Sequence, residues 1–260
     1  MLVDSHCHID FPDLADNLPQ VLGLMHDNDV GCAVCIGVTL EEFPRIQALV
    51  DSNRTIFASV GVHPETTDVR EPSIADLVTL AQHPKVIAIG ETGLDYYWHK
   101  DAPEWQRERF RTHIRAARAC GKPLVIHTRS ASDDTLAILR EEGEDGAGNR
   151  AGGVFHCFTE SMQVARAALD LGYYISFSGI VTFKSAQDLR DVAAFVPMDR
   201  MLIETDSPYL APVPYRGKTN NPSFVPLVAR QIAQTRGIPL EAVAQATSRN
   251  FETLFKGVVA

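Results

Sequence analysis

Short apolar runs alternate with longer amphipathic segments along the whole chain. The short runs read as buried β-strands, because most are continuously apolar, as parallel strands are when both faces are covered. Eight strands are predicted: Leu2–His8, Cys32–Val38, Ile56–His63, Val86–Thr92, Pro123–His127, Gly153–Cys157, Tyr173–Ser178 and Met201–Asp206. The pattern therefore predicts an α/β protein built on a parallel sheet.

The segments between these strands have the apolar spacing of helices that pack on a sheet. The clearest predicted helices are Leu40–Ser52, Ile74–Gln82, Glu104–Cys120 and Ser185–Phe195. Thr39 and Glu42 resemble a capping box at the start of the first. Eight strand–helix units favour a (β/α)8 barrel that forms a single domain over residues 1–260. A doubly wound open sheet is the alternative, but no GxGxxG motif follows the first strand.

Two segments are predicted to be loops. The stretch Glu141–Gly153 is polar and glycine-rich, and we expect it at the surface. Ser207–Pro226, after the eighth strand, is long and contains several prolines. Because long loops in compact domains are often functional, the second loop is a candidate for substrate contact.

The composition, at 45% apolar and 22% charged residues, is that of a globular protein with a sizeable core. We find neither a signal peptide nor an apolar stretch of the roughly 20 residues that span a membrane. Of the five cysteines, Cys32 and Cys35 form a CxxC inside an apolar run, which favours buried strand residues over a redox pair. We therefore expect a cytoplasmic protein without membrane contact.

The formal net charge is −9. Broad, non-specific binding of duplex DNA needs many lysines and arginines to neutralise phosphates, so this charge argues against it. A nucleic-acid substrate held locally, at a metal site, remains compatible with the charge.

Metal-ligating side chains recur at the ends of the predicted strands, which all lie on one face of a barrel. His6 and His8 are two residues apart and therefore point to the same side of the first strand. Other strands end in His63, Glu91, His127, His156 and Asp206. One strand-end histidine alone is usually a hydrogen-bonded imidazole, but the whole set with its carboxylates predicts a metal site.

The set suits two divalent metal ions. The ligands would be His6, His8, Glu91, His127, His156 and Asp206. Glu91 is the candidate to bridge the ions, and Asp206 could both bind an ion and accept the proton of an activated water. Nitrogen and oxygen ligands favour Zn, Mn or Mg. His63 is surplus to this count and could serve a phosphate or a leaving group, or be structural, whereas Cys157 is expected to point into the core.

A series of motifs in chain order resembles the TatD family of metal-dependent hydrolases. The motifs are DSHCHID at the start, GVHP (Gly61–Pro64), GETGLDY (Gly90–Tyr96), IHTR (Ile126–Arg129), FHCFTE (Phe155–Glu160), SFSGIVTF (Ser176–Phe183), ETDSPYLAP (Glu204–Pro212) and TSRNFETLF (Thr247–Phe255). The resemblance implies a TIM barrel of the amidohydrolase superfamily with metal-dependent deoxyribonuclease activity.

The resemblance also implies roles for individual residues. It assigns metal ligation to the same residues, His6, His8, Glu91, His127, His156 and Asp206, and it matches His63 to the family's strand-three histidine. It matches Asp95 to the family's loop carboxylate. Many members have Asn-Glu-Pro in the loop after strand eight, where this chain has Asn220-Asn221-Pro222, so the substrate contacts of that loop stay open.

Further candidates for substrate contact follow the strand ends. Arg129 could hold a phosphate through its fork, or form a rim salt bridge. Arg216 and Lys218 could meet a nucleic-acid backbone, or be solvated. The aromatic run Tyr96–Trp98 could stack on bases, with at least one member packing internally. Glu204 is expected to support the site from behind, and the arginine-rich segment 107–118 is expected to be a solvated outer face.

These features favour a deoxyribonuclease, a phosphodiesterase that uses water activated by two metals and acts as an exonuclease on single-stranded or frayed DNA ends. An amidohydrolase-type enzyme that opens an amide, ester or lactone in a small molecule is the alternative. A catalytically idle barrel that binds a partner is less favoured, because it would not need six convergent ligands. No obligate protein partner is inferred.

Overall fold

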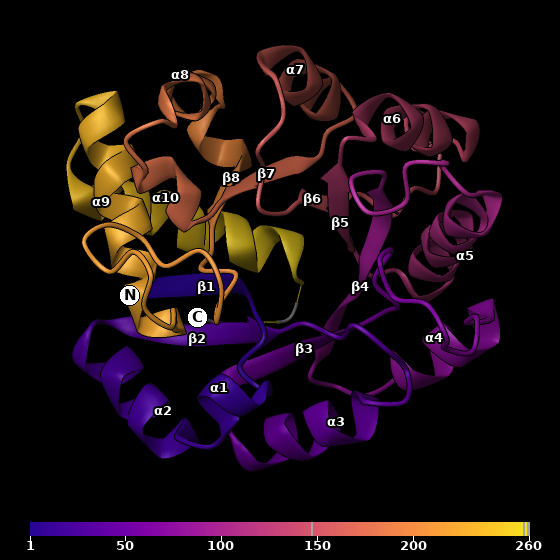
Figure 1. The fold of residues 1–260 in the computed structure, drawn as a ribbon, viewed down its shortest axis with the longest axis horizontal. Helices are drawn as coiled ribbons and strands as arrows, with labels where there is room; N and C mark the ends of the chain where they lie inside the picture. Colours follow the sequence, from indigo (N-terminus) through magenta and orange to yellow (C-terminus); the bar gives the residue numbers. More distant parts are fainter. Residues whose placement is uncertain (147, 257, 259–260) are drawn as a thin grey trace.

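The computed structural model describes residues 1–146, 148–256 and 258. Parallel strands pair in sequence order, β1 to β8, in an eight-stranded sheet that curls into a ring (Figure 1). The strands are β1 (Leu2–Cys7), β2 (Val30–Cys35), β3 (Ile56–Val60), β4 (Val86–Asp95), β5 (Leu124–Arg129), β6 (Gly153–Phe155), β7 (Tyr174–Phe177) and β8 (Met201–Ile203). All eight predicted strands are confirmed, and the fold is the predicted (β/α)8 TIM barrel rather than an open sheet.

Hydrogen bonds close the ring between β1 and the segment that follows β8. The N–H of Asp206 donates to the carbonyl of His6 at 3.0 Å, and the N–H of His8 donates to the carbonyl of Ser207 at 2.7 Å. Cys7 and Ser207 form a parallel bridge between them. The closure therefore fixes the two predicted ligand segments, HxH and ETD, against each other.

Helices surround the ring (Figure 1). They are α1 (Pro12–Ala15), α2 (Leu18–Asp27), α3 (Phe43–Ser52), α4 (Ile74–Leu80), α5 (Glu104–Cys120), α6 (Ser132–Glu141), α7 (Met162–Asp170), α8 (Gln187–Phe195), α9 (Val225–Arg236) and α10 (Leu240–Leu254), with 3-10 turns η1 (Gly179–Thr182), η2 (Met198–Arg200) and η3 (Pro222–Phe224). The predicted helices are confirmed as α3, α4, α5 and α8. The predicted capping box is wrong in position: Thr39 Oγ1 accepts from the N–H of Glu42, but α3 begins only at Phe43.

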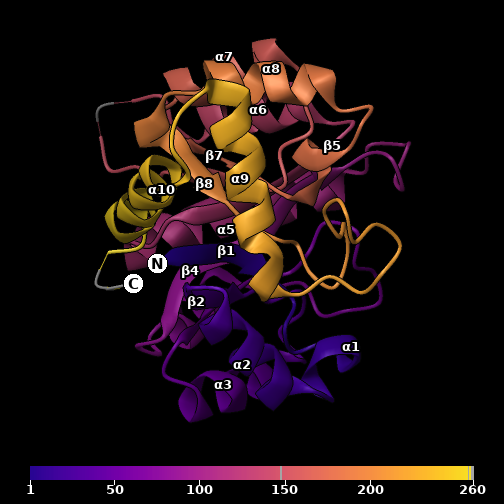
Figure 2. The same cartoon turned by 90° about the vertical axis from the view of Figure 1, so that its left-hand side faces the viewer.

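Strand side chains alternate between two apolar layers. One layer packs against the surrounding helices, and the other includes Val34, Val125 and Leu202 together with Phe251 of α10 and Phe255, which follows it. Figure 2 shows α10 on the side of the barrel opposite the loop that follows β8. The amino-terminal end of the barrel is thus closed by apolar side chains, which leaves the carboxyl-terminal end for chemistry.

Helix α10 is fastened to the strand starts by its polar side chains. Asn250 Nδ2 donates to the carbonyls of Met198 and Met201 at 2.7 and 2.8 Å. Ser248 Oγ donates to the carbonyl of Met1 at 3.0 Å. These bonds satisfy carbonyl groups that the ends of the strands would otherwise leave unpaired.

Other expectations about buried residues are partly met. Cys32 and Cys35 are both buried in β2, as predicted. The polar segment Glu141–Gly153, in which Ala147 lies outside the described residues, is not only a surface loop. Its Glu144 is fully buried and accepts from the N–H groups of Ala151 and Gly152. Within the described residues, no helix has the length and apolarity that crossing a membrane requires.

Candidate metal centre

The predicted metal-binding side chains converge at the carboxyl ends of the strands. Most of them line one cavity of about 740 Å³. They are His8, His63, Glu91, His127, His156 and Asp206. His6 is fully buried, and its Nε2 lies 3.4 Å from Glu91 Oε2 and 3.5 Å from Asp206 Oδ1. All of the predicted ligand side chains therefore come together in one place.

Glu91 lies at the centre of this cluster, and its two oxygens face different histidines. Oε1 is 2.7 Å from His156 Nε2, 3.1 Å from His127 Nδ1 and 3.2 Å from His63 Nε2. Oε2 is 3.4 Å from His6 Nε2. The carboxylate is therefore shared between two groups of nitrogen atoms.

Asp206 and His8 complete the group around Glu91 Oε2. Asp206 Oδ1 lies 3.5 Å from His6 Nε2 and 3.6 Å from His8 Nε2. Three sets of ligand atoms lie within 4.8 Å of one another: those of His6, His8 and Glu91, those of His6, His156 and Asp206, and those of His63, Glu91 and His127. The site thus offers more than one place for a cation.

The path of β4 delivers Glu91 into the barrel through a glycine. Gly90 has a φ of +145°, and a Cβ atom there would lie 2.6 Å from the carbonyl oxygen of Val125 on the next strand. The N–H of Glu91 donates to the carbonyl of Gly37 at 3.0 Å. Since only glycine fits this close approach, the GETG motif has a packing reason beside its carboxylate.

The electrostatics of the cluster favour ionised carboxylates. Burial alone would raise the pKa of Glu91, but the neighbouring His156, His63 and His6 outweigh it and hold that pKa well below its usual range. Burial likewise opposes ionisation of Asp206, but its hydrogen bond with His8 and the nearby histidines lower the pKa. Burial, and then the charge of His156, lowers the pKa of His6. Against the effect of burial, carboxylates that include Glu91 raise the pKa of His127 and His156, so a cation would bind there in competition with protons.

Unpartnered buried nitrogen atoms test whether a metal fits here. Among the described residues, neither ring nitrogen of His6 has a hydrogen-bond partner, and the same holds for Nδ1 of His8. A buried polar group left without a partner costs about 1–3 kcal/mol. A cation between His6 Nε2 and the oxygens of Glu91 and Asp206 would satisfy it, so the residues present fit a divalent metal.

Two carboxylates outside the cluster set the tautomers of two histidines. Asp95 Oδ2 lies 2.9 Å from His127 Nε2, and Glu204 Oε1 lies 3.3 Å from His156 Nδ1. A proton on each of these nitrogens would leave the lone pair of the other ring nitrogen available to a cation beside Glu91. Both oxygens of Asp95 have protein partners, and the residue also lines the cavity, so its predicted contact with substrate stays a prediction beside this positioning role.

His63 has the opposite arrangement. Its Nδ1 accepts a hydrogen bond from the N–H of Glu65 at 3.1 Å. A neutral imidazole that accepts at Nδ1 carries its proton on Nε2. That proton points toward Glu91 Oε1, 3.2 Å away. His63 thus presents a donor to the cavity. Its role as a functional residue rather than a principal ligand stays a prediction, since it also belongs to one of the three possible ligand sets.

Tyr96, predicted to contact substrate, lies outside the cavity lining. Its hydroxyl donates to Asp134 Oδ2 at 2.7 Å and accepts from Arg107 Nε at 3.1 Å. Tyr96 is not among the residues that line the cavity, whereas Trp98 is. The member of the aromatic run that packs internally is therefore Tyr96, because α5 and α6 supply partners for its hydroxyl.

Arg216 and Lys218 also lie outside the cavity lining. The guanidinium carbon of Arg216 is 3.6 Å from the ring centre of Phe183, and Lys218 Nζ is 5.8 Å from that of Tyr215. Their cationic groups therefore lie over aromatic rings, that of Phe183 just after η1 and that of Tyr215 in the same loop. The structure does not bring these two residues to the metal ligands, as direct substrate contact at the site would require.

Two predictions about side-chain direction are wrong. Cys157 lines the cavity instead of the core, because the backbone turns there with a φ of +41°. Its N–H donates to Glu204 Oε1 at 2.7 Å. In the arginine-rich helix α5, Arg109 is buried rather than solvated and donates to the carbonyls of His63 and Thr66, both at 2.8 Å.

The loop after β8 is held by its asparagines. Asn220 is fully buried, and its Nδ2 donates to the carbonyls of Thr205 and Tyr209 at 2.9 and 2.6 Å. Asn221 Oδ1 accepts from the N–H of Ser223 at 3.0 Å at the start of η3. The Asn220-Asn221-Pro222 departure therefore has a structural use: Asn220 anchors the loop, and Asn221 caps the short helix that follows it.

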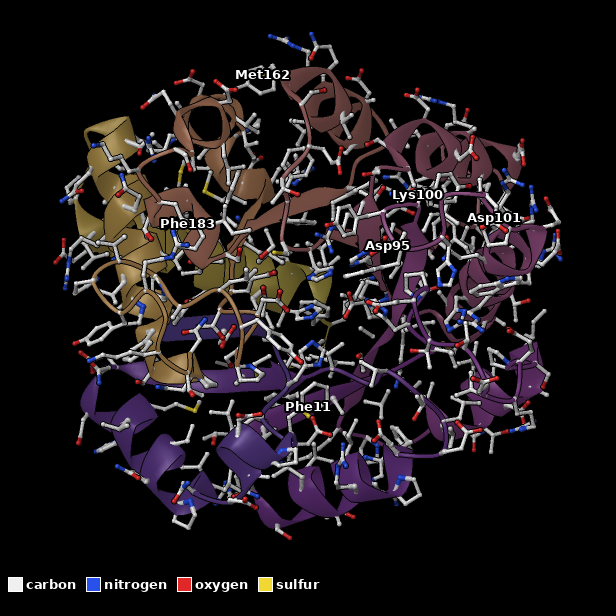
Figure 3. The ribbon with its side chains drawn as sticks, viewed as in Figure 1. Phe11, Asp95, Lys100, Asp101, Met162 and Phe183 are labelled. Carbon is white, nitrogen blue, oxygen red and sulfur yellow. The ribbon has the colours of Figure 1, made fainter. Side chains whose placement is uncertain are left out.

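Several lining residues were missed by the sequence reading. Phe11, Ile180, Tyr209 and Leu210 contribute to the cavity wall. In Figure 3, Phe11 and Asp95 lie inside the ring of helices, whereas Met162 lies on its outer side. Phe11 follows the HxH motif, and Tyr209 lies within ETDSPYLAP. Their short distance in sequence from the predicted ligands could have indicated that they line the cavity.

The comparisons with known proteins agree with this geometry. The family model described as TatD related DNase matches residues 3–256. The chain is 46% identical over 258 residues to the uncharacterized metal-dependent hydrolase YcfH of Escherichia coli (strain K12), covering 98% of this chain and 95% of that protein. It is 32% identical over 225 residues to the 3'-5' ssDNA/RNA exonuclease TatD of Klebsiella pneumoniae (strain 342), covering 84% of each.

A solved structure is similar over nearly the whole chain. The crystal structure of YJJV, a TatD homologue from Escherichia coli K12, superposes with a TM-score of 0.91 at 29% identity. The match covers 99% of this chain and 98% of that one. The chain therefore belongs to the TatD family and is a metal-dependent hydrolase.

Proposed function

We propose that this hydrolase is a deoxyribonuclease that cleaves phosphodiester bonds at single-stranded or frayed DNA ends with two divalent metal ions, Zn, Mg or Mn. The observation that carries the proposal is the position of Glu91, whose oxygens face two separate groups of histidine nitrogens across the cavity. A shared carboxylate of this kind is the usual bridge in two-metal hydrolytic sites.

Two groups of side chains would hold the ions. His6, His8 and Asp206 form the first group with Glu91 Oε2. His127 and His156 form the second with Glu91 Oε1. When bound, the ions would lower the pKa of a water and stabilise charge on the entering and leaving oxygens.

The chain's own residues supply the remaining steps. Asp206, ionised because its pKa is lowered, can accept the proton of the attacking water. His63 Nε2–H can donate to a phosphate oxygen or to the leaving oxygen. Asp95 and Glu204 hold the imidazoles of His127 and His156 in the tautomers that face Glu91.

The substrate class follows from charge and shape. A chain with net charge −9 repels a long polyanion, so contact is confined to a few nucleotides near the cavity. The ligands lie recessed at the bottom of this cavity, with Glu91 and His6 buried, and a free end enters such a site more easily than a continuous duplex does. The Klebsiella relative named as a single-strand exonuclease supports the same class.

Metal-loaded protein incubated with end-labelled single-stranded DNA, and separately with a closed single-stranded circle, tests the proposal. We expect stepwise shortening of the linear strand and an intact circle, with no cleavage by Glu91→Gln. Rapid cutting of the circle would contradict the need for an end. Inertness on both substrates, alongside turnover of a lactone or an amide, would replace the nuclease with an amidohydrolase-type activity.

A further inference from the structure

The rim of the cavity carries large aromatic side chains that remain in solvent. Trp98, on the loop after β4, is 57% exposed, and Tyr209, on the loop after β8, is 55% exposed. Both line the cavity. Apolar rings of this size are normally covered, and exposed ones at a cavity mouth indicate a surface for a ligand that has a flat face of its own.

One carboxylate, that of Asp95, contacts both the backbone of Trp98 and a proposed metal ligand. Asp95 Oδ1 accepts from the N–H groups of Tyr97 and Trp98 at 3.0 and 3.2 Å, while its Oδ2 contacts His127 Nε2 at 2.9 Å. The loop that carries the indole is therefore fixed to the same residue that orients a ligand histidine. A base that rests on Trp98 would be placed at a defined distance from Glu91.

Arg129 supplies an unpaired cation beside this aromatic surface. Its guanidinium carbon lies 3.9 Å from the ring centre of Tyr97 and 5.9 Å from that of Trp98. No described residue forms an ion pair with it, although it lines the cavity of a protein rich in carboxylates. Stacking on Tyr97 occupies the face of the guanidinium and leaves its N–H edge available to a phosphate.

Two arginines of α5 contrast with Arg129. Arg111 pairs with Glu104, Glu108 and Glu141, and Arg115 pairs with Glu142. Their charges are already compensated by the protein's own acidic residues. At the cavity mouth, compensation of the Arg129 charge is left to a ligand.

We propose that Trp98 and Arg129 form a nucleotide subsite in which the indole stacks on a nucleobase and the guanidinium pairs with the phosphate next to it. Tyr209 forms the opposite wall. The inference rests on the proposed function and adds that the enzyme recognises the presence of a base without reading its identity, since every base has a face that stacks. Substrates without a base next to the scissile bond lose this contact.

Steady-state kinetics on the metal-loaded protein tests the subsite. One substrate is a single strand, and the other is the same strand with abasic residues at its terminal positions. We expect kcat/KM to be roughly 10- to 100-fold higher for the intact strand, mainly through KM, because stacking supplies binding energy. In Trp98→Ala this preference disappears. Tyr215→Ala is the matched control, since Tyr215 is an exposed aromatic outside the cavity lining, and it keeps the preference.

Tryptophan fluorescence gives a second readout that a merely structural role would not move. The chain has two tryptophans, so Trp105→Phe leaves Trp98 as the only source of signal. A phosphorothioate single strand should quench this signal, and its abasic counterpart should not.

Each other outcome decides against the inference. Equal kcat/KM on both strands, with DNA still hydrolysed, overturns the subsite and leaves the proposed function intact. Equal loss of kcat on both strands in Trp98→Ala would make Trp98 a structural residue. Absence of any DNA hydrolysis by the unmodified protein overturns the proposed function and the subsite together.

Discussion

The two ends of the barrel are built from the same strands but satisfy their side chains in different ways. At the amino-terminal end, Phe251 of α10 and Phe255 just after it are fully buried among apolar residues, and Asn250 bonds to two carbonyl groups. At the carboxyl-terminal end, His6 has both ring nitrogens buried and unpartnered, and Glu204 Oε2 is unpartnered as well.

This difference indicates that residues at one end of the barrel stabilise the fold, whereas residues at the other end serve metal binding and catalysis. An unpartnered buried group destabilises a fold, so the unpartnered ring nitrogens gathered on His6 and His8 at the open end indicate a function there. Substitutions at the closed end should therefore change the free energy of unfolding, and substitutions at the open end should change metal binding and turnover. The predictions below test that separation, beginning with the largest expected effect.

Glu91→Gln should abolish function and leave the fold intact. The substitution removes the negative charge shared between the two groups of histidines. The amide nitrogen that replaces one carboxylate oxygen can neither accept a hydrogen bond nor bind a cation. We expect turnover to fall by roughly 100-fold or more, beyond the upper range seen when only a supporting residue is removed. Mass spectrometry measures the metal content, and the circular dichroism spectrum reports whether the fold is intact. Unchanged metal content would show that Glu91 is not a ligand.

Phe251→Ala should act on stability alone. Phe251 is a fully buried residue of α10, in the apolar layer at the amino-terminal end of the barrel. Removing its phenyl ring leaves a cavity and costs about 3–5 kcal/mol in the free energy of unfolding. Turnover per folded molecule should stay at the original level, because Phe251 lies at the other end of the barrel. Urea unfolding and active-site titration check this, with Phe251→Leu as the milder control. Lost turnover at full stability would break the separation of the two ends.

His113 should make stability depend on pH. This buried residue of α5 accepts from the N–H of Val62 and contacts the carbonyl of Arg109, and burial lowers its pKa from 6.5 to about 4. Its stabilisation is complete above pH 6.5 and is lost as pH falls toward 4, because the unfolded chain takes up the proton first. The loss should reach about 3 kcal/mol. The non-titrating His113→Gln should lack this component in urea unfolding at pH 7 and pH 4.5.

A steeper loss of stability in His113→Gln than in the original protein would contradict that sign. It would mean that His113 is charged in the folded state, in conflict with its burial against the N–H of Val62.

Glu204→Gln should weaken metal binding without removing a ligand. The carboxylate that fixes the tautomer of His156 is lost, and such supporting partners typically contribute 10–100-fold in metal affinity. Asp95→Asn should do the same through His127. Competition with a fluorescent chelator measures both. Glu144→Gln is the matched control and should leave metal affinity unchanged. Glu144 is a buried carboxylate in the segment before β6 and is not part of the cavity lining.

Much of the fold and the metal cluster could be predicted from the sequence because a barrel gathers strand ends on one face. Once Leu2–Cys7 and Met201–Ile203 are recognised as strands, His6 and Asp206 must approach each other. The direction of a side chain just after the end of a strand could not be predicted from the sequence. Tyr96 and Trp98 are two residues apart, yet one bonds to Asp134 and the other lines the cavity.

Partners distant in sequence explain the other misses. Arg109 is buried because its N–H groups reach the carbonyls of His63 and Thr66, which no helical periodicity reveals. Arg216 turned away because Phe183, from the segment before α8, offers its ring. Such pairings are decided by loop geometry, which depends on the completed barrel rather than on local pattern.

The central claim is that two cations sharing Glu91 support DNA hydrolysis, and one titration tests it most directly. Chelator-treated protein is titrated with Zn or Mn while bound metal and hydrolysis of a single-stranded DNA end are followed together. The account predicts that full activity requires two equivalents per chain and that Glu91→Gln never develops it. Full activity at one bound equivalent, or with none bound, would contradict the account.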